Sequence, residues 1–191
     1  LAAGISHLHS KNIAHLDISL ENVLIDAGGT WKICDFGVAQ DVSRKEDKAP
    51  LQHVGKVYYM APEIAFPSFQ DFDPRLSDMY SLGICLFIMV FGVQPYYSPS
   101  VEDHRFVYLA KYGVKDLLQY YRFLGNTGHQ VLTLLENLLV HHEKRWNIFQ
   151  VLDYISTIEE LFDFPIHPLT FDHHHDTTGV GAIPHSRLNT N

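Results

Sequence analysis

Cysteine and positive charge are both scarce in this sequence. The two cysteines, Cys34 and Cys85, lie inside apolar runs, which predicts buried free thiols in a reducing compartment and argues against a disulfide. The 14 lysine and arginine residues are outnumbered by 22 aspartates and glutamates, so the formal net charge is −8 with histidine neutral. This acidic balance argues against nucleic acid or an anionic membrane as the main partner. We therefore expect an intracellular, cytoplasmic protein.

Long hydrophobic runs, a recognisable signal peptide and internal repeats are also missing from the printed sequence. The longest apolar stretch, residues 79–93, is shorter than the roughly 20 residues that span a bilayer, which argues against a membrane partner. The chain is long and apolar enough to form a core, because it has 191 residues, of which 46% are hydrophobic and 19% charged. This composition favours one globular domain with a buried core.

The most informative stretch runs from His15 to Gly37, where polar loops alternate with short apolar runs. Residues 23–25 and 31–34 are apolar and are separated by the turn sequence DAGG, which predicts a β-hairpin. One polar loop precedes this hairpin and a second one follows it. Because both loops leave the same end of the hairpin, we expect their side chains to lie close together.

Three side chains in these loops carry suitable oxygen atoms, namely Asp17 and Asn22 in the first loop and Asp35 in the second. Two carboxylates and an amide oxygen are hard donors, and such donors suit a Mg²⁺ ion that carries a phosphate. We therefore expect these three residues to converge on one cation. The alternative, from the residues alone, is that each of them caps its own loop.

The two loops resemble the catalytic and metal-binding loops of the eukaryotic protein kinases, whose pattern is H-R-D-L-x-x-x-N followed by D-F-G. Residues 15–22 read HLDISLEN, residues 35–37 read DFG, and residues 61–63 read APE, the third motif of the family. Each motif alone is weak evidence, but their order and spacing together are specific. The resemblance covers residues 1–162, whereas residues 163–191 turn to Pro, His, Thr, Gly and Asn and predict a disordered tail.

The resemblance implies a fold that is mainly α with a small β-hairpin, the α+β architecture of the C-terminal lobe of a protein kinase. It also implies transfer of a phosphoryl group from Mg·ATP to a hydroxyl of a protein substrate. Asp17 would orient that hydroxyl and accept its proton, and Asn22 and Asp35 would hold Mg²⁺. Leu24 would support the adenine ring, and Glu21 would face the ribose or a basic substrate residue. The alternatives for these last two are a core leucine and a solvated glutamate.

The sequence departs from the family pattern at two places beside Asp17. Leu16 replaces the arginine that normally pairs with a phosphorylated activation loop, so we expect that phosphorylation of this loop does not switch the protein on. Ser19 stands where serine/threonine kinases usually have a lysine, and Lys56 stands where the docking loop, here GKVYYMAPE, usually has a threonine. Because these positions face each other in the family, we expect Lys56 to reach Asp17 as a relocated catalytic lysine. The alternative is an exposed lysine beside a weakened site.

The resemblance implies two further contacts that hold the fold together. Glu63 of the APE motif would form a buried ion pair with Arg145, and Asp78 would hydrogen-bond to the backbone of the catalytic loop. Alternatively, Asp78 or Ser77 caps the start of a central helix that is apolar on every face and continues to Phe91. The spacing of apolar residues also predicts helices over residues 1–10, 104–112, 131–139 and 148–161.

The sequence that precedes the catalytic loop contains no G-x-G-x-x-G motif and no strand with V-A-I-K. The chain also starts at Leu1, inside its first predicted helix, so we expect a fragment that holds the larger kinase lobe and has little activity alone. The docking loop ends in YMAPE, which favours a serine/threonine kinase acting on a protein substrate. The alternative is a pseudokinase or scaffold that binds protein partners without phosphoryl transfer, and Leu16 and Ser19 leave this alternative open.

Overall fold

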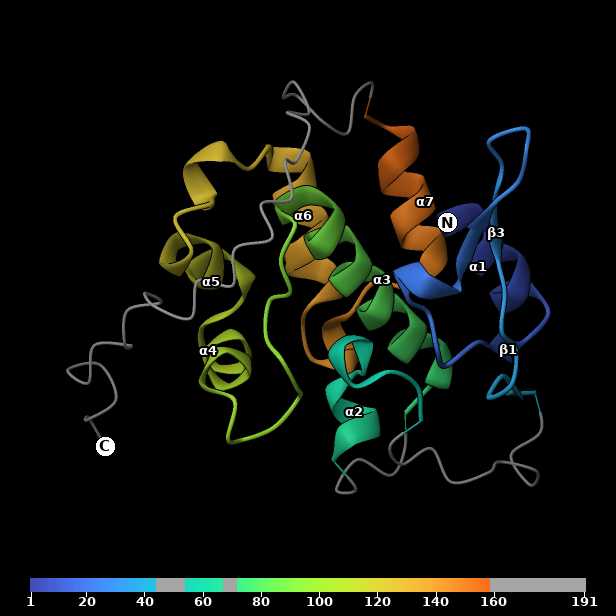
Figure 1. Cartoon of the computed structure of the whole chain (residues 1–191), viewed down its shortest axis with the longest axis horizontal. Helices are drawn as coiled ribbons and strands as arrows, with labels where there is room; N and C mark the ends of the chain where they lie inside the picture. Colours follow the sequence, from blue (N-terminus) through green and yellow to red (C-terminus); the bar gives the residue numbers. More distant parts are fainter. Residues whose placement is uncertain (44–53, 67–71, 159–191) are drawn as a thin grey trace.

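The computed structural model describes residues 1–43, 54–66 and 72–158, and Figure 1 shows its course. The α-helices are α1 (Ala2–Ser10), α2 (Pro62–Ala65), α3 (Pro74–Phe91), α4 (His104–Tyr112), α5 (Val114–Tyr120), α6 (His129–Leu138) and α7 (Ile148–Ser156). The strands are β1 (Ile13–Ala14), β2 (Val23–Ile25), β3 (Trp31–Ile33) and β4 (Gln40–Asp41). Short 3-10 helices are η1 (Leu20–Asn22), η2 (Val57–Tyr59), η3 (Leu124–Asn126) and η4 (His142–Lys144). The expected fold class, mainly α with a small β-hairpin, is confirmed for these residues.

Helix α3 lies in the middle of the molecule, with α4 and α5 to one side and α1 and the strands to the other (Figure 1). It packs against α1, α6, β1 and η2, and its residues 77–87 are all buried. A Cβ atom at Gly83 would lie 2.8 Å from side-chain atoms of both Leu138 and Leu139, so α3 and α6 approach each other closely at this glycine. The prediction of a central helix buried on every face is therefore confirmed for residues 77–87, whereas residues 88–91 are only partly buried and Met89 is exposed.

The start of α3 differs from the prediction that Ser77 or Asp78 caps it. The cap is Asp73, whose side chain accepts a hydrogen bond from the backbone N–H of Arg75 at 3.0 Å, and Pro74 occupies the first helical position. Aspartate at the cap followed by proline is a favoured way to begin a helix. The helix thus starts before Ser77, and the side chains of Ser77 and Asp78 are used for contacts with other segments.

Helix α3 is also long and apolar enough, by length and composition, to cross a membrane. This differs from the expectation drawn from residues 79–93, because the helix begins earlier than that stretch and has 18 residues. However, 67% of the apolar window is buried inside the fold. The core helix of a globular domain passes the same test, so this feature is weak evidence for a membrane span.

The predicted β-hairpin is formed by β2 and β3, which pair antiparallel with Leu24 opposite Lys32. Asp26 makes its turn, because its side chain accepts hydrogen bonds from the backbone N–H groups of Gly28 at 2.9 Å and Thr30 at 3.0 Å. A second antiparallel pair joins β1 to β4, with Ala14 opposite Gln40. The sequence did not predict this second pair, because two-residue strands carry no periodic pattern.

The remaining helices follow the predicted apolar spacing, with three differences. Helix α6 covers His129–Leu138, where residues 131–139 were predicted. Helix α4 has the predicted bounds, whereas α5 was missed because Gly113, with a φ of 84°, both ends α4 and starts α5 without a connecting loop. Helix α7 ends at Ser156, earlier than predicted. The apolar residue Leu161 and the tail predicted at residues 163–191 lie outside the described part of the chain.

Both cysteines are free thiols, as the sequence predicts. Cys85 is buried in the middle of α3, and burial raises the pKa of its thiol to about 12. Cys34 is half-buried directly after β3, so the prediction of a buried thiol is confirmed for Cys85 and only in part for Cys34.

The ion pair between Glu63 and Arg145 is present and buried, so this prediction is confirmed. The Arg145 guanidinium contacts both carboxylate oxygens of Glu63, and it also donates hydrogen bonds to the carbonyl oxygens of Leu76 and Val140, each at 2.8 Å. Burial would raise the pKa of Glu63, but its hydrogen bonds and charge interaction with Arg145 outweigh burial and lower that pKa. Arg145 therefore joins α2, the first turns of α3 and the end of α6 through one side chain.

Replacing Arg145 by Met is expected to lower the free energy of unfolding by about 3–5 kcal/mol, because Glu63 would be left as a buried charge without its partner. The measurement is urea unfolding at pH 7. Lys144→Met is the matched control, since Lys144 is the exposed neighbour in the same turn, and it should change the stability by less than about 0.5 kcal/mol. Equal effects of the two substitutions would contradict the structural role of Arg145.

Candidate active site

The loop between β1 and β2 is fastened to α3 by the carboxylate of Asp78. This side chain is 1% exposed, and it accepts hydrogen bonds from the backbone N–H groups of His15 at 2.8 Å and Leu16 at 2.7 Å. Leu16 has a φ of 65°, a left-handed conformation that residues other than glycine rarely adopt. The two hydrogen bonds help to hold this conformation. The predicted contact of Asp78 with the loop is confirmed.

A third group on the Asp78 carboxylate comes from α1. His9 is buried, and its Nε2 atom lies 2.8 Å from Asp78 Oδ2. Sequence reasoning missed this contact, although His9 follows Leu8, which the apolar spacing places on the core side of that helix. Asp78 thus links α1, α3 and the loop at one buried point.

The imidazole of His15 connects the two polar loops. Its Nδ1 atom accepts a hydrogen bond from the backbone N–H of Asp17 at 3.3 Å, and its Nε2 atom lies 3.1 Å from the carbonyl oxygen of Cys34. The ring also makes an edge contact with Phe36, with 5.0 Å between ring centroids. The DFG loop is therefore held directly against the loop that carries Asp17.

Asp17 and Asn22 form the centre of the site. The Asn22 side-chain N–H₂ group donates to Asp17 Oδ2 at 2.7 Å and to the Asp17 carbonyl oxygen at 2.8 Å. The first bond orients the carboxylate, and the second closes the loop of residues 17–22 on itself. Ser19, which lies between them in the sequence, is completely buried.

Lys56 reaches this group from the docking loop, residues 55–63, which we also call the docking segment. Lys56 itself lies directly before η2. Its ammonium nitrogen lies 2.9 Å from Asp17 Oδ2, 3.0 Å from Asn22 Oδ1 and 3.1 Å from Ser19 Oγ. Its backbone N–H donates to Asp17 Oδ1 at 2.8 Å. The predicted approach of Lys56 to Asp17 is therefore confirmed, and both carboxylate oxygens of Asp17 are contacted by Lys56. The part that Lys56 plays in catalysis stays a prediction.

Asp35 lies on the neighbouring DFG loop and is exposed to solvent. Its Oδ1 atom accepts a hydrogen bond from the backbone N–H of Gly37 at 3.3 Å, and its φ of 64° is left-handed. The backbone N–H of Cys34, one residue earlier, donates to the carbonyl oxygen of Asn22 at 2.9 Å. The two loops are thus joined, while the convergence of Asp35 with Asp17 and Asn22 on one cation stays a prediction.

The chemistry of the Asp35 carboxylate fits a magnesium ion that carries a phosphate. Within the described ranges, three or more His, Cys, Asp or Glu side chains do not gather in a metal-binding cluster. Magnesium needs no such cluster, because it usually takes one or two protein oxygen ligands and completes its shell with phosphate and water. Asp35 offers an exposed carboxylate with room for such an ion. Asn22 Oδ1 accepts the ammonium of Lys56 at 3.0 Å, so a magnesium ion would share this oxygen with Lys56.

The two residues predicted to contact the nucleotide lie at the surface beside this centre. Leu24 is 57% exposed on β2, so the alternative of a core leucine is wrong. Glu21 is also exposed, and it lies near Tyr59. Burial raises the pKa of Tyr59, and the negative charge of Glu21 raises it further. Glu21 therefore stands beside the docking loop, while Leu24 faces outward from the hairpin.

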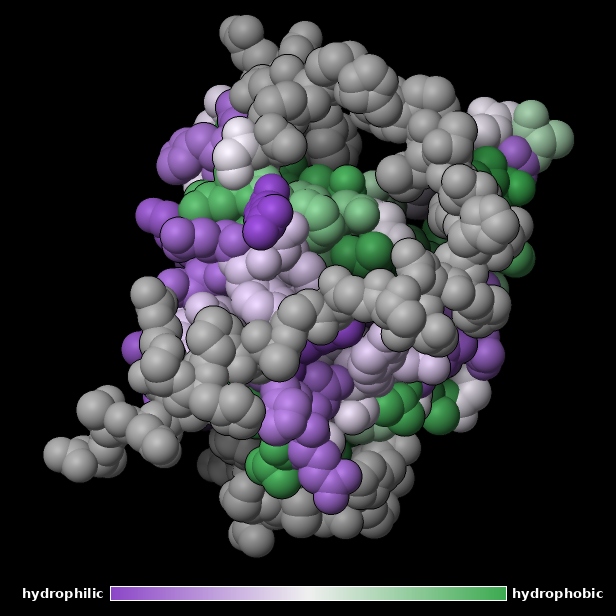
Figure 2. Space-filling model, turned by 60° about the vertical axis from the view of Figure 1, so that its left-hand side comes forward, coloured by the Kyte–Doolittle hydropathy of each residue, from purple (hydrophilic) through white to green (hydrophobic). Residues whose placement is uncertain are grey.

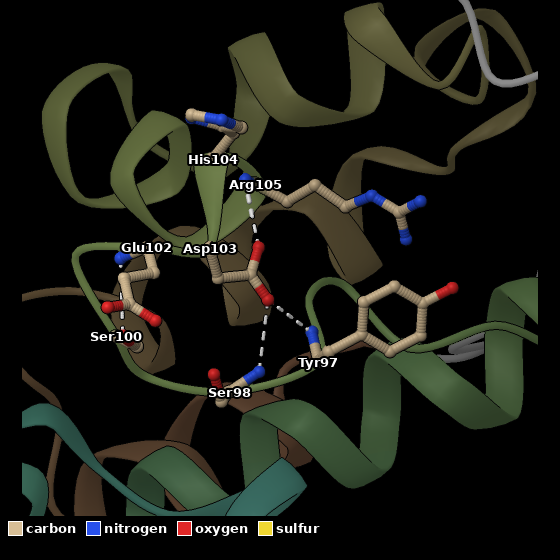
Figure 3. Close-up of a pocket in the computed structure, with 7 residues that line it drawn as sticks. All are labelled: Tyr97, Ser98, Ser100, Glu102, Asp103, His104 and Arg105. Atoms are coloured by element: carbon tan, nitrogen blue, oxygen red, sulfur yellow. Dashed lines mark hydrogen bonds between the residues drawn. The ribbon is translucent and has the colours of Figure 1, made fainter.

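Two hollows lie elsewhere on the molecule. One of about 530 Å³ is lined mainly by apolar residues of α2, α4 and the segment after α6. The other, of about 370 Å³, lies at the start of α4, on the side of the molecule that Figure 2 brings forward. Figure 3 shows that the Asp103 carboxylate there points at backbone N–H groups, and these include Tyr97 at 2.7 Å and Ser98 at 3.0 Å. Asp103 is thus a structural cap, and neither hollow is lined by Asp17, Asn22 or Asp35.

Gly55 brings Lys56 close to the catalytic loop. Its φ is 87°, and a Cβ atom at this position would lie 2.5 Å from the carbonyl oxygen of Leu16 and 3.3 Å from Asp17 Oδ1. Real Cβ atoms essentially never approach another atom to 2.5 Å, so the segment fits against the loop only because residue 55 is glycine. The sequence gives a weak signal of this, a glycine directly before the lysine.

The fold and the site together define a kinase-like protein, in which a helical domain with a small hairpin presents an aspartate, an asparagine and a DFG loop. The chain matches the protein kinase domain family over residues 1–155. It therefore belongs to the protein kinase domain family. This agrees with the motifs at residues 15–22, 35–37 and 61–63.

The chain is also similar to curated serine/threonine-protein kinases. It is 36% identical over 111 residues to CHK1 of Saccharomyces cerevisiae, a match that covers 56% of this chain and 21% of that protein. It is 32% identical over 169 residues to SRK2C of Arabidopsis thaliana, covering 84% of this chain and 46% of the relative. With SAPK3 of Oryza sativa subsp. japonica the identity is 38% over 102 residues, covering 52% and 29%. The chain thus spans less than half the length of these relatives.

Replacing Gly55 by Ala is expected to destabilise the fold more than the same change at Gly29. Both glycines have a positive φ, but a Cβ atom at Gly29 would meet nothing within 4 Å. Gly29→Ala should therefore cost only the conformational strain, about 1–2 kcal/mol, whereas Gly55→Ala adds a steric clash of about 1–3 kcal/mol. Urea unfolding of the two variants measures the difference, and equal destabilisation would show that the docking segment is not packed against the loop as described.

Proposed function

We propose that the protein is a Mg·ATP-dependent serine/threonine kinase and that residues 1–162 form the larger, C-terminal lobe of its catalytic domain. The observation that carries this proposal is the group around the Asp17 carboxylate. Asn22 and Lys56 hold this carboxylate in place with hydrogen bonds of 2.7 to 2.9 Å. Membership of the protein kinase domain family supports the same conclusion.

Asp17 acts as the base in this proposal. A serine or threonine hydroxyl of a protein substrate donates a hydrogen bond to the carboxylate, which orients the oxygen toward the terminal phosphate of ATP. The bond from this oxygen to phosphorus forms while the bond from phosphorus to the bridging oxygen of ADP breaks. The hydroxyl proton passes to Asp17. The side chain of Asp17 is 13% exposed, so the carboxylate is shielded from most water yet open to a substrate.

Asp35 and Asn22 would hold the magnesium ion, which neutralises negative charge on the phosphates when it is bound. Leu24 would rest against the adenine ring, and Glu21 would face the ribose or a basic residue of the substrate. The exposure of apolar side chains on the hairpin supports this assignment. Leu24 is 57% exposed, and Ile25 and Trp31, which pair across the hairpin, are also exposed. Because neighbouring strand residues point to opposite faces, the hairpin has exposed apolar side chains on both faces, which a bound nucleotide and a second lobe would cover.

A cytoplasmic location and the absence of nucleic-acid and membrane partners are parts of the same proposal. The supporting observations are the net charge of −8 and two free cysteines. An acidic surface suits basic protein segments better than it suits phosphate-bearing polymers.

A pseudokinase or scaffold is the second candidate. The observations that favour it are Leu16 in place of the usual arginine and Ser19 in place of the usual lysine. The intact group of Asp17, Asn22 and Asp35 favours the enzyme. The Asp17 variant described next separates the two, because a scaffold would have no activity for that variant to lose.

Replacing Asp17 by Asn is expected to lower phosphorylation of a mixed serine and threonine peptide library by at least about 10²-fold, since the hydroxyl loses its base. Transfer of labelled phosphate from Mg·ATP by the full-length protein is the measurement. Asp153→Asn, an exposed aspartate on α7, is the matched control and should keep full activity. Activity that does not depend on Asp17 would refute the kinase proposal.

The same assay includes the 191-residue chain by itself as a second arm. We expect this chain to show little activity, because phosphoryl transfer depends on positioning and charge stabilisation from both sides of the nucleotide. Appreciable phosphorylation by the chain alone, lost in Asp17→Asn, would show that the larger lobe is sufficient.

Treatment with a phosphatase is expected to leave the activity within about twofold. The reason is that Leu16 is buried and apolar, so this position supplies no guanidinium for a charge-assisted contact with a phosphorylated activation loop. Peptide phosphorylation before and after treatment is the measurement, with mass spectrometry to verify that phosphate was removed. A large loss of activity would contradict this prediction.

A further inference from the structure

We propose that Lys56 is the cation that contacts the transferred phosphoryl group, and that the docking segment therefore delivers part of the catalytic charge. This inference rests on the proposed kinase function. It concerns Lys56, which lies 39 residues after Asp17 and comes from a different segment of the chain. The evidence is the position of its ammonium group and the way in which the segment around it is held.

The ammonium group of Lys56 lies where charge develops in the proposed reaction. It is 2.9 Å from Asp17 Oδ2, the carboxylate that receives the proton, and 3.0 Å from Asn22 Oδ1. The substrate hydroxyl and the phosphorus atom that it attacks have to approach the same carboxylate. A cation fixed beside them stabilises the negative charge on the phosphoryl oxygens without having to move, which is the most effective form of electrostatic catalysis.

The position of Lys56 is also fixed by contacts of the backbone on both sides of it. The Lys56 side chain is 34% exposed, and its backbone N–H is bonded to Asp17 Oδ1 at 2.8 Å. Gly55 packs against the carbonyl oxygen of Leu16, where no side chain fits. On the far side of η2, the hydroxyl of Ser81 donates to the carbonyl oxygen of Tyr59 at 2.8 Å. The segment is therefore held at both ends, by the catalytic loop and by α3.

Ser19 faces Lys56 across this gap, with 3.1 Å between Ser19 Oγ and the ammonium nitrogen. Ser19 is completely buried, and its hydroxyl serves as an acceptor for that ammonium. Exchange of the two residues would bring a lysine from the loop side into the same space and leave a hydroxyl on the docking side. This arrangement gives a test that separates the position of the charge from the presence of Lys56 itself.

The contacts of Asp17 depend on the position of the docking segment. When the segment is in place, Lys56 orients both oxygens of Asp17 and supplies a positive charge beside them. When it is displaced, the base loses the contacts of 2.8 and 2.9 Å together. The inference is therefore that the segment on which the substrate docks also completes the catalytic site, without requiring a phosphate on the activation loop.

The experiment compares four variants of the full-length protein, using a mixed serine and threonine peptide library and Mg·ATP. Lys56→Met is expected to lower kcat by about 10²–10³-fold, the usual effect of removing one group that stabilises developing charge. The KM for peptide should change little, because the interaction is made chiefly in the transition state. The double variant Ser19→Lys with Lys56→Ser should recover kcat to within about tenfold of the wild type. Lys115→Met, an exposed lysine on α5, should have no effect. Asp17→Asn is included to test the base.

The outcomes are distinguishable. A loss in Lys56→Met that the exchange variant repairs supports the proposal, with thermal melting to show that each variant is folded. If Lys56→Met keeps kcat within about threefold while Asp17→Asn is inactive, the kinase function stands and the role of Lys56 is refuted. If Asp17→Asn is as active as the wild type, or if the wild type transfers no phosphate, the kinase function fails and this proposal fails with it. A loss that the exchange does not repair, in a folded variant, also counts against a transferable charge.

Discussion

The carboxylate of Asp78 is the contact on which the catalytic loop depends. It accepts two backbone hydrogen bonds from the loop, at His15 and Leu16, and lies against the imidazole of His9 from the first helix. Because the site is buried, each unsatisfied amide would cost about 1–3 kcal/mol, so loop and helix are held together strongly. The left-handed backbone at Leu16 is stable in this setting. These bonds also fix the backbone position of Asp17, which is the next residue.

A second buried polar contact holds the docking segment in the same way. Arg145 uses its guanidinium for Glu63 and for carbonyl oxygens at Leu76 and Val140. Glu63 also accepts a hydrogen bond from Ser77, one residue before Asp78. The catalytic loop and the docking segment are therefore fastened to adjacent residues of one central helix. Because both segments are attached to this one helix, their side chains can meet within hydrogen-bond distance.

The site itself shows how a change of sequence can keep a charge in place. A short hydroxyl on the catalytic loop and a long ammonium on the docking segment fill one space, since Ser19 Oγ and Lys56 Nζ lie 3.1 Å apart. The length and flexibility of a lysine side chain allow its charge to reach a given point from more than one direction. The location of the charge is thus less restricted than the location of the backbone that carries it. Asp17 has no such freedom, because its side chain is short and its neighbours in the loop hold the carboxylate in place.

The sequence by itself determined the motifs, the long helices and the hairpin. Apolar spacing is a local property, so α4 was predicted with its correct bounds, and the order of HLDISLEN, DFG and APE identified the family. Two partners separated by many residues, Glu63 with Arg145 and Asp78 with the loop, followed from the resemblance to that family. The tertiary structure decided what local pattern does not contain. The short β1–β4 pair, the contact of His9 with Asp78 and the close approach of Gly55 to Leu16 each depend on residues that meet only after the chain has folded. The cap of α3 is a different case, because Asp73 followed by Pro74 is a local start signal that the sequence analysis missed. The tertiary structure decided instead that Asp78 binds the distant loop.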